Sequence, residues 1–283
     1  MAAPARIATT GATGNVGGRV ARLLSAAGAG QVLVVRAPSR APDLPGASVA
    51  RAAFEDGDAV RSALAGVPVA FMVSASEDAR RVDAHRTFVD AAVAAGVEHV
   101  VYLSFLGAAP DATFTFARDH WATEEHLRSA GVGLTVLRDS TYADFLPFLV
   151  GEDGVLRGPA GDGKVAPVAQ DDVAEAAAAV LLDPAAHAGR TYDLTGPEAV
   201  SLDEISSVLS AELGRRVRYQ PETVDEAYAS RAAFGAERWE VDGWVSTYTA
   251  VAAGELAVLS DDVERLTGHP ARSIVEVLRT RRS

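Results

Sequence analysis

Cysteine is absent from the 283-residue sequence, and its absence removes several kinds of chemistry at once. A chain without thiols forms no disulfide, no thiolate zinc site and no cysteine nucleophile. The histidines also lack the spacing of metal ligands, so we predict no metal site. The sequence also has no apolar run long enough to cross a bilayer. The longest apolar runs, such as residues 173–182, are short and are interrupted by charge. We therefore expect no membrane partner.

Positive charge is the second shortage. The chain has 26 Lys and Arg against 38 Asp and Glu, which gives a formal net charge of -12. Such an acidic surface repels nucleic acid, whose binding depends on Lys and Arg at phosphates. We interpret the short basic stretch 279–282 as a favourable helix end and a solvated tail. The N-terminal residues enter the first strand directly and leave no room for a secretory signal, so we expect a cytoplasmic protein.

A glycine-rich stretch near the N-terminus is the most informative part of the sequence. It follows the strand-type run 7–10 and precedes residues 19–24, whose apolar positions recur at helical spacing. Gly11 permits a tight turn, Gly14 lets the backbone approach a diphosphate, and Gly17 lets the helix pack closely on the sheet. A strand, a glycine turn and a helix in this order predict a dinucleotide-binding corner. The alternative is a plain glycine turn without a ligand.

Two features around this corner indicate the nucleotide. The N–H groups near Asn15 and Val16 would face the phosphates at the positive end of the helix dipole. Where an NAD-selective fold usually has Asp or Glu, at the end of the second predicted strand, this chain has Arg36, with Ser39 and Arg40 just beyond. Cations there suit a 2′-phosphate, so we predict NADP(H) as the cofactor. The alternative is that Arg36 is an exposed loop arginine.

Strand-type and helix-type segments alternate through the first half of the chain, and the strands are apolar. This pattern predicts an α/β fold, a Rossmann-type doubly wound parallel sheet with helices on both faces. Predicted strands cover residues 7–10, 31–36, 48–54, 67–74, 99–104, 134–138 and 191–194, and predicted helices cover 17–29, 58–65, 78–96, 118–130 and 171–182.

The pattern becomes mostly helical toward the C-terminus. Capping boxes at Ser201 and Ser273 open two of these helices. We predict a dinucleotide-binding domain of residues 1–144 plus 166–195, and a smaller, mostly helical substrate or lid domain of residues 145–165 plus 196–283. The aromatic residues of this smaller domain either form its core or provide a wall for a flat substrate. They are Trp239, Trp244 and Tyr248.

Several motifs spread over nearly the whole chain occur together in a known family. They are the stretches 10–17, 102–104, 120–124, 127–131, 137–138, 170–174, 191–198 and 261–268. With these motifs the chain resembles the atypical short-chain dehydrogenase/reductases, and specifically the NmrA-like branch with its quinone and dye reductases. The resemblance implies an NAD(P)H-dependent oxidoreductase, either a ketoreductase or a quinone reductase.

The resemblance also implies cofactor contacts. Thr13 belongs to the matching glycine motif and is included in the predicted cofactor site. Ser74 and Ala75, at the end of the fourth predicted strand, would line the central ribose and phosphates, and Phe54 would lie near the adenine. Family members often have an aspartate just before that aromatic residue, where this chain has Ala53.

The expected catalytic group departs from the superfamily pattern. Standard members use a serine with a Tyr-x-x-x-Lys pair, in which the tyrosine donates a proton and the serine polarises the carbonyl. By resemblance the serine is Ser104, but the matching pair is Phe116 and His120, and phenylalanine donates no proton. In one interpretation His120 holds the nicotinamide ribose and the substrate takes its proton from water or from its own hydroxyl. In another, His120 or Tyr142 supplies the proton.

We therefore expect an NADPH-dependent reductase that transfers hydride to a carbonyl or quinone of a small, aromatic, polyketide-like molecule without the usual tyrosine. The alternative is a non-catalytic NADP(H)-sensing regulatory protein of the NmrA-like type. We expect a monomer or a homodimer.

Overall fold

The computed structural model of the chain describes residues 6–281, which form two compact units. The first unit contains the residues up to Phe105 together with Asp119–Arg138 and Asp171–Tyr192. The second unit contains Leu106–Arg118, Asp139–Gln170 and the residues from Asp193 onward. Among the helices of the described residues, none has the length and apolar character that crossing a bilayer requires.

A seven-stranded sheet organises the first unit. Its order is β3-β2-β1-β4-β5-β6-β9, and the first five of these strands pair in parallel. The strands are β1 (Ile7–Thr10), β2 (Gln31–Val35), β3 (Ala47–Arg51), β4 (Val69–Val73), β5 (His99–Phe105), β6 (Gly133–Asp139) and β9 (Thr191–Leu194). The predicted doubly wound fold is confirmed. The strand order reverses between β1 and β4, and open sheets of this kind bind ligands at the carboxyl ends of the strands beside such a reversal.

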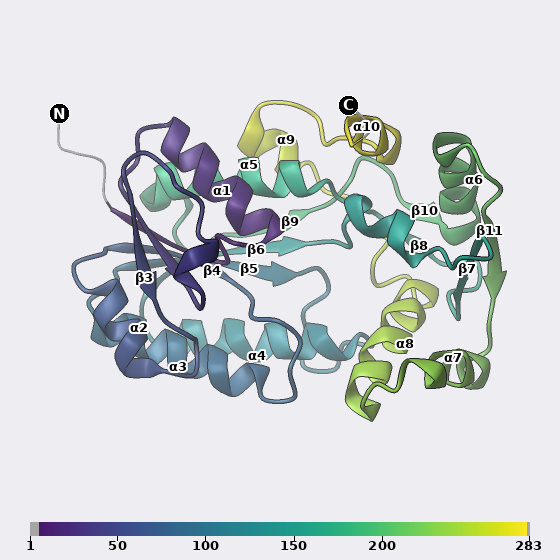
Figure 1. Ribbon diagram of the computed structural model, residues 1–283, viewed down its shortest axis with the longest axis horizontal. Coiled ribbons are helices and arrows are strands. Elements are labelled where there is room, and N and C mark those ends of the chain that lie inside the picture. The colour runs from purple at the N-terminus through teal and green to yellow at the C-terminus, as the bar shows by residue number, and fades with distance from the viewer. Residues whose placement is uncertain (1–5, 282–283) are drawn as a thin grey trace. The chain divides into compact units, whose positions relative to one another are not determined.

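Helices cover both faces of this sheet, with α1 and α5 on one face and α2, α3 and α4 on the other (Figure 1). They are α1 (Asn15–Ala26), α2 (Gly57–Leu64), α3 (Arg81–Ala94), α4 (Thr115–Ser129) and α5 (Gln170–Leu182). Helix α1 lies on the sheet because Val16, Val20 and Leu24 recur on its buried face. On the opposite face, Phe88 and Leu127 are fully buried within an apolar cluster of the unit. Each such side chain contributes about 2 kcal/mol through the apolar area it removes from water.

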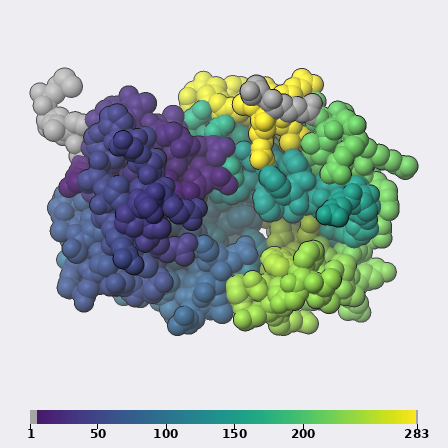
Figure 2. All heavy atoms as spheres, in the orientation of Figure 1, coloured from purple at the N-terminus to yellow at the C-terminus, as the bar shows by residue number. Residues whose placement is uncertain are grey.

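The edge strand β3 differs from its prediction. The sequence predicted a fully apolar strand over 48–54, but β3 ends at Arg51 and Val49 is 46% exposed. As the last strand of the sheet, β3 has only β2 as a neighbour. Its dark blue atoms lie at the surface in Figure 2. An edge strand does not need the apolar composition of strands buried on both faces. The prediction that all strands of the sheet are apolar is therefore wrong for β3.

The second unit consists of short helices with two small sheets. Its helices are α6 (Leu202–Leu213), α7 (Val224–Arg231), α8 (Arg238–Ala252), α9 (Asp262–Thr267) and α10 (Ile274–Thr280). One small sheet pairs β8 (Lys164–Val165) with β10 (Val200–Ser201), and the other pairs β7 (Val155–Gly158) with β11 (Arg218–Pro221). The 3-10 turns of the chain are η1 (Pro38–Arg40), η2 (Ala143–Leu149), η3 (Pro184–His187) and η4 (Ala232–Phe234).

Two local predictions fall in this second unit. Capping boxes at Ser201 and Ser273 open α6 and α10, as predicted. Two C-terminal arginines have partners: Arg279 forms an ion pair with Glu212 at 3.1 Å, and Arg281 donates a hydrogen bond to the backbone oxygen of Asp144. Both arginines are exposed, so the interpretation as a favourable helix end and a solvated tail stays compatible with these contacts, and residue 282 lies outside the described residues.

Candidate active site

The glycine corner between β1 and α1 has the close contacts that only glycine tolerates. Gly11 has φ +64°, in the left-handed region, and its carbonyl oxygen accepts a hydrogen bond from Gly14 N–H at 2.8 Å. A Cβ at Gly17 would lie 2.4 Å from the Gly11 oxygen. Real Cβ atoms do not approach backbone oxygen so closely, so a side chain at Gly17 would push the first turn of α1 away from the corner. The predicted jobs of Gly11 and Gly17 thus have a direct geometric basis.

The first turn of α1 also has the electrostatics that an anion needs. Within residues 6–281, no side chain caps this helix at Gly14, and its first turn carries no acidic residue. By contrast, α6 and α10 have serine caps and acidic residues in their first turns. The free N–H groups and the positive end of the α1 dipole are therefore not neutralised by the described side chains. Thr13, Gly14 and Asn15 are exposed at this turn, so the corner fits a diphosphate group.

The predicted 2′-phosphate residues lie beyond the carboxyl end of β2. Arg36, Ser39 and Arg40 are all exposed, and Ser39 and Arg40 lie in the turn η1. Among the described residues, neither arginine has a partner in a side-chain hydrogen bond or ion pair, in contrast to Arg19, whose Nε lies 2.6 Å from the Asp171 carboxylate. Two uncommitted guanidinium groups at this position are compatible with a phosphate ligand.

The loop after β4 is held by a histidine that the sequence analysis did not single out. Ala75 N–H donates a hydrogen bond to His85 Nε2 at 2.9 Å. Ser74 and Ala75 are half-buried at the end of β4. Phe54 stacks on Phe88 with ring centres 4.4 Å apart and lies 5.9 Å from the His85 ring. The contacts of Phe54 and Ala75 with the adenosine half of a coenzyme remain predictions.

His120 is buried rather than exposed in the first turns of α4. Its Nδ1 lies 3.0 Å from the hydroxyl of Tyr102, a fully buried residue of β5. Burial lowers the pKa of His120 well below its usual range, and the nearby Arg81 guanidinium lowers it further. Arg81 is itself buried and pairs with Asp119 at 3.1 Å. His120 is therefore neutral at pH 7, and a neutral imidazole is a poor general acid.

Ser104 has a different partner from the one predicted. Its hydroxyl donates a hydrogen bond to Glu124 Oε1 at 2.6 Å, and both residues have no exposed surface. The Glu124 carboxylate also accepts from Arg138 at 2.9 and 2.7 Å and from Arg128 at 2.8 Å. The serine proton is thus committed to a network that ties α4 to β5 and β6. This geometry favours a structural role for Ser104, and its role in polarising a carbonyl stays a prediction.

Tyr142 belongs to the second unit, where its hydroxyl donates a hydrogen bond to Asp139. Burial raises the pKa of Asp139 to about 7. Burial, together with the Asp139 carboxylate, also raises the pKa of Tyr142 well above its usual range. The phenol of Tyr142 is therefore a weak acid here, and its proposed role as a proton donor stays a prediction.

Phe116, also in the second unit, is part of an aromatic core. Its ring lies 5.6 Å from Phe114 and 6.1 Å from Trp239. A Cβ at Gly243 would lie only 2.4 Å from the Phe116 ring, so glycine in α8 makes room for it. The contact between Trp239 and Phe116 supports the interpretation of Trp239 as a core residue. Phe116, which stands at the position of the usual catalytic tyrosine, is thus a packed apolar ring.

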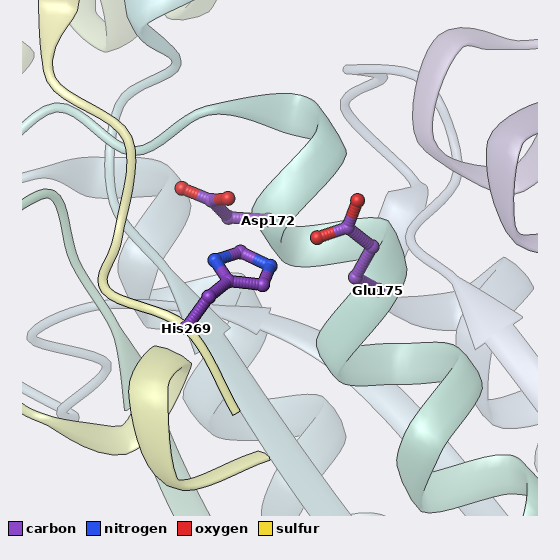
Figure 3. A group of neighbouring side chains, drawn as sticks. All are labelled: Asp172, Glu175 and His269. Carbon is purple, nitrogen blue, oxygen red and sulfur yellow. The ribbon is translucent and has the colours of Figure 1, made fainter. Parts of the chain in front are cut away.

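Two carboxylates project from the start of α5. Asp172 is buried and Glu175 is half-buried, and both side chains are drawn in Figure 3. His269, labelled in the same figure, belongs to the second unit. We assign no metal to these two carboxylates.

The residues missed by the sequence analysis are His85, Tyr102 and Arg81. A usable signal existed in α3, because Arg81, His85 and Phe88 recur at helical spacing on its buried face. A polar residue on a buried helix face needs a partner, so the spacing predicts a buried hydrogen bond even though it cannot name Ala75.

A protein-family model and several known proteins are similar to this chain. A model described as the NmrA-like family matches residues 4–231. The chain belongs to the NmrA-like family. Quinone oxidoreductase 2 of Escherichia coli K12 is 34% identical over 278 residues, covering 95% of this chain and 96% of that protein. The resemblance predicted from the motifs is confirmed.

One further relative and one solved structure are also similar to this chain. A (4-alkanoyl-5-oxo-2,5-dihydrofuran-3-yl)methyl phosphate reductase of Streptomyces griseus is 35% identical over 272 residues, 94% of each chain. The crystal structure of the NADPH-dependent quinone oxidoreductase from Escherichia coli in complex with NADPH has a TM-score of 0.89 and 33% identity, and it covers 98% of this chain and 100% of that one.

Proposed function

We propose that this chain is an NADPH-dependent oxidoreductase that reduces a small conjugated carbonyl compound, a quinone or an aromatic ketone. The observation that carries the proposal is the corner from Gly11 to Gly17, where glycine contacts and an uncapped helix leave N–H groups for a diphosphate. Relatives that cover nearly the whole chain, the quinone oxidoreductase and the dihydrofuranone phosphate reductase, are named for reductase activities.

Each predicted cofactor residue has a definite task in this proposal. Thr13, Asn15 and Val16 complete the corner that holds the diphosphate, while Arg36 and Arg40, with Ser39 between them, hold the 2′-phosphate of NADPH. Ser74 and Ala75 line the central ribose, and Phe54 lies near the adenine. When bound, NADPH supplies a hydride.

His120 is proposed to orient the coenzyme rather than to donate a proton. In the neutral tautomer whose Nδ1 accepts from the Tyr102 hydroxyl, the ring proton lies on Nε2, which can donate to a ribose hydroxyl. The depressed pKa of His120 keeps the ring in this neutral form at pH 7. The residue thus takes the ribose-holding task of the superfamily lysine without its positive charge.

The substrate class follows from the missing acid. Reduction of a quinone leaves a phenolate, whose conjugate acid has a pKa of about 10, so water protonates it without help. Reduction of a simple aliphatic ketone leaves an alkoxide that needs a positioned acid. The lack of a tyrosine at position 116 and the neutral form of His120 therefore favour quinones and phenol-stabilised ketones as substrates, and a polyketide-like aromatic compound is the finer proposal. A cytoplasmic location and a monomeric or homodimeric state are also proposals.

The test uses purified protein, titrated by calorimetry with NADPH and NADH and then assayed for loss of reduced-nicotinamide absorbance. We expect tighter binding of NADPH, turnover of quinones, and at least a hundredfold lower kcat/KM for an aliphatic ketone, since general acid catalysis contributes about that factor. The His120→Ala variant should raise the NADPH Kd. NADPH binding without turnover of any acceptor would favour the regulatory alternative, and no NADPH binding would refute the proposal.

A further inference from the structure

A chain of three hydrogen bonds passes through His85 in the first unit. Thr123 Oγ1 donates its proton to the backbone oxygen of Asp119 at 2.8 Å, so it accepts from His85 Nδ1–H, also at 2.8 Å. The other ring nitrogen, Nε2, then has no proton and accepts from Ala75 N–H at 2.9 Å. The partners of the ring therefore fix a single neutral tautomer.

This tautomer connects the parts of the predicted coenzyme site. Ala75 lies in the loop after β4, and Thr123 lies one turn beyond His120 in α4. The His85 ring is 5.9 Å from Phe54 and 6.2 Å from Tyr102, which holds His120. His85 has no exposed surface. One buried ring thus contacts the loop, the aromatic residue and the helix that we assign to coenzyme binding.

We propose that His85 is a positioning residue for NADPH, and that its Nε2 lone pair fixes the backbone of the loop after β4 in the conformation that receives the coenzyme. The inference rests on the proposed function. The ring itself is buried behind the loop, so its effect on the coenzyme passes through Ala75 rather than through direct contact. A loop with a satisfied N–H is already ordered before binding, and less of the binding free energy is spent on ordering it.

The groups around His85 keep its ring neutral. Arg81 lies one helix turn before His85 and pairs with Asp119, while Tyr102 and His120 face the ring from β5 and α4. Burial and the Arg81 charge lower the pKa of His85 to about 3. The Nε2 lone pair is thus available to Ala75 over the whole pH range in which the protein would be assayed.

The same unit offers a matched control in His99. Its Nε2 lies 2.9 Å from Thr135 Oγ1, which donates to the backbone oxygen of His187 at 2.8 Å. His99 is buried too, but it is the first residue of β5, at the amino end of a parallel strand. Its substitution tests the loss of a buried histidine at the edge of the sheet that is not assigned to the coenzyme.

The experiment compares His85→Leu, His85→Gln and His99→Leu with the wild type. Leucine removes both ring nitrogens, whereas the glutamine amide oxygen can still accept from Ala75 N–H. We measure the NADPH Kd by calorimetry, the melting temperature without ligand, and amide hydrogen exchange at Ala75 in the unliganded protein.

His85→Leu should raise the Kd about tenfold and abolish protection of Ala75, as expected for one unsatisfied N–H. His85→Gln should restore both to within about threefold, and His99→Leu should lower the melting temperature with the Kd unchanged.

Each result has a definite meaning. A His85→Leu variant with unchanged Kd would refute the positioning role. Equal losses of melting temperature in His85→Leu and His85→Gln, with no recovery of Kd in the second, would do the same, because only packing would then be involved. A wild type that binds no NADPH would instead overturn the proposed function, and this inference with it.

Discussion

Each of the two ends of the main sheet contains a buried histidine that donates a hydrogen bond to a threonine hydroxyl, but the surroundings of the two histidines differ. At the carboxyl end, His85 donates to Thr123 and joins α3 to α4. At the amino end, His99 donates to Thr135 and joins β5 to β6. Each threonine passes its proton to a backbone oxygen. The difference lies in the second ring nitrogen.

That second nitrogen meets the loop after β4 in one case and packed backbone in the other. His85 Nε2 accepts from Ala75 N–H, while a Cβ placed on Gly133 would come within 2.9 Å of His99 Nδ1. In our proposal His85 serves coenzyme binding because its second nitrogen faces this loop, whereas His99 serves the fold. Substitutions at matched positions of the two ends should therefore separate stability from coenzyme binding.

The largest expected effect comes from glycine at the carboxyl end. Gly17→Ala should raise the NADPH Kd at least hundredfold, about 2.7 kcal/mol, because its Cβ would overlap the Gly11 oxygen. Gly133→Ala is the control at the amino end, where a Cβ would lie 2.8 Å from the Glu98 oxygen. It should lower the melting temperature and leave the Kd of the folded protein unchanged. A Kd affected equally by both variants would erase the distinction between the ends.

A charge reversal sharpens the same comparison. Arg36→Glu should raise the NADPH Kd about thirtyfold, the value of a charge-assisted phosphate contact of about 2 kcal/mol, with little change for NADH. Arg6→Glu makes the same change of charge just before β1, at the amino end, where Arg6 donates to Ser48. Calorimetry with both coenzymes measures the ratio. An unchanged preference in Arg36→Glu would remove this residue from the proposed site.

The third comparison concerns the dependence of stability on pH. The pKa of His85 is lowered to about 3 and that of His99 is also lowered, in both cases by burial, so the folded protein binds fewer protons than the unfolded chain below pH 6.5. The free energy of unfolding is therefore full above pH 6.5 and falls as the pH drops toward 3, by up to about 1.4 kcal/mol per pH unit for His85, and His99 adds to the loss below pH 6.5.

Denaturant titrations between pH 7 and 5 measure this slope. His85→Gln should flatten it more than His99→Gln, since the larger shift belongs to His85. A slope that neither variant changes would mean that other groups, His120 among them, account for the acid sensitivity.

Much of the fold was predictable because its signals are local. The run from Thr9 to Gly18 determines a strand, a turn and a helix within a few residues, and apolar strands alternate with helices thereafter. The predicted strand over 48–54 failed at its end, because apolar composition does not reveal which strand lies at the edge of a sheet.

The site was less predictable because its contacts are distant in sequence. Ser104 lies twenty residues from Glu124, and Ala75 lies ten residues from His85. The resemblance to the family indicated which positions matter, but it assigned Ser104 to a substrate and passed over His85. Side-chain partners across elements require the fold itself, whereas helix caps such as Ser201 need only the next three residues.

The uncapped first turn of α1 has one more consequence. Because residues 6–281 provide neither a capping side chain nor an acidic residue there, a bound diphosphate would complete the helix as a removable cap. Binding of the coenzyme would then stabilise the amino-terminal βα unit. The free energy of unfolding of the protein would rise with the concentration of free reduced coenzyme.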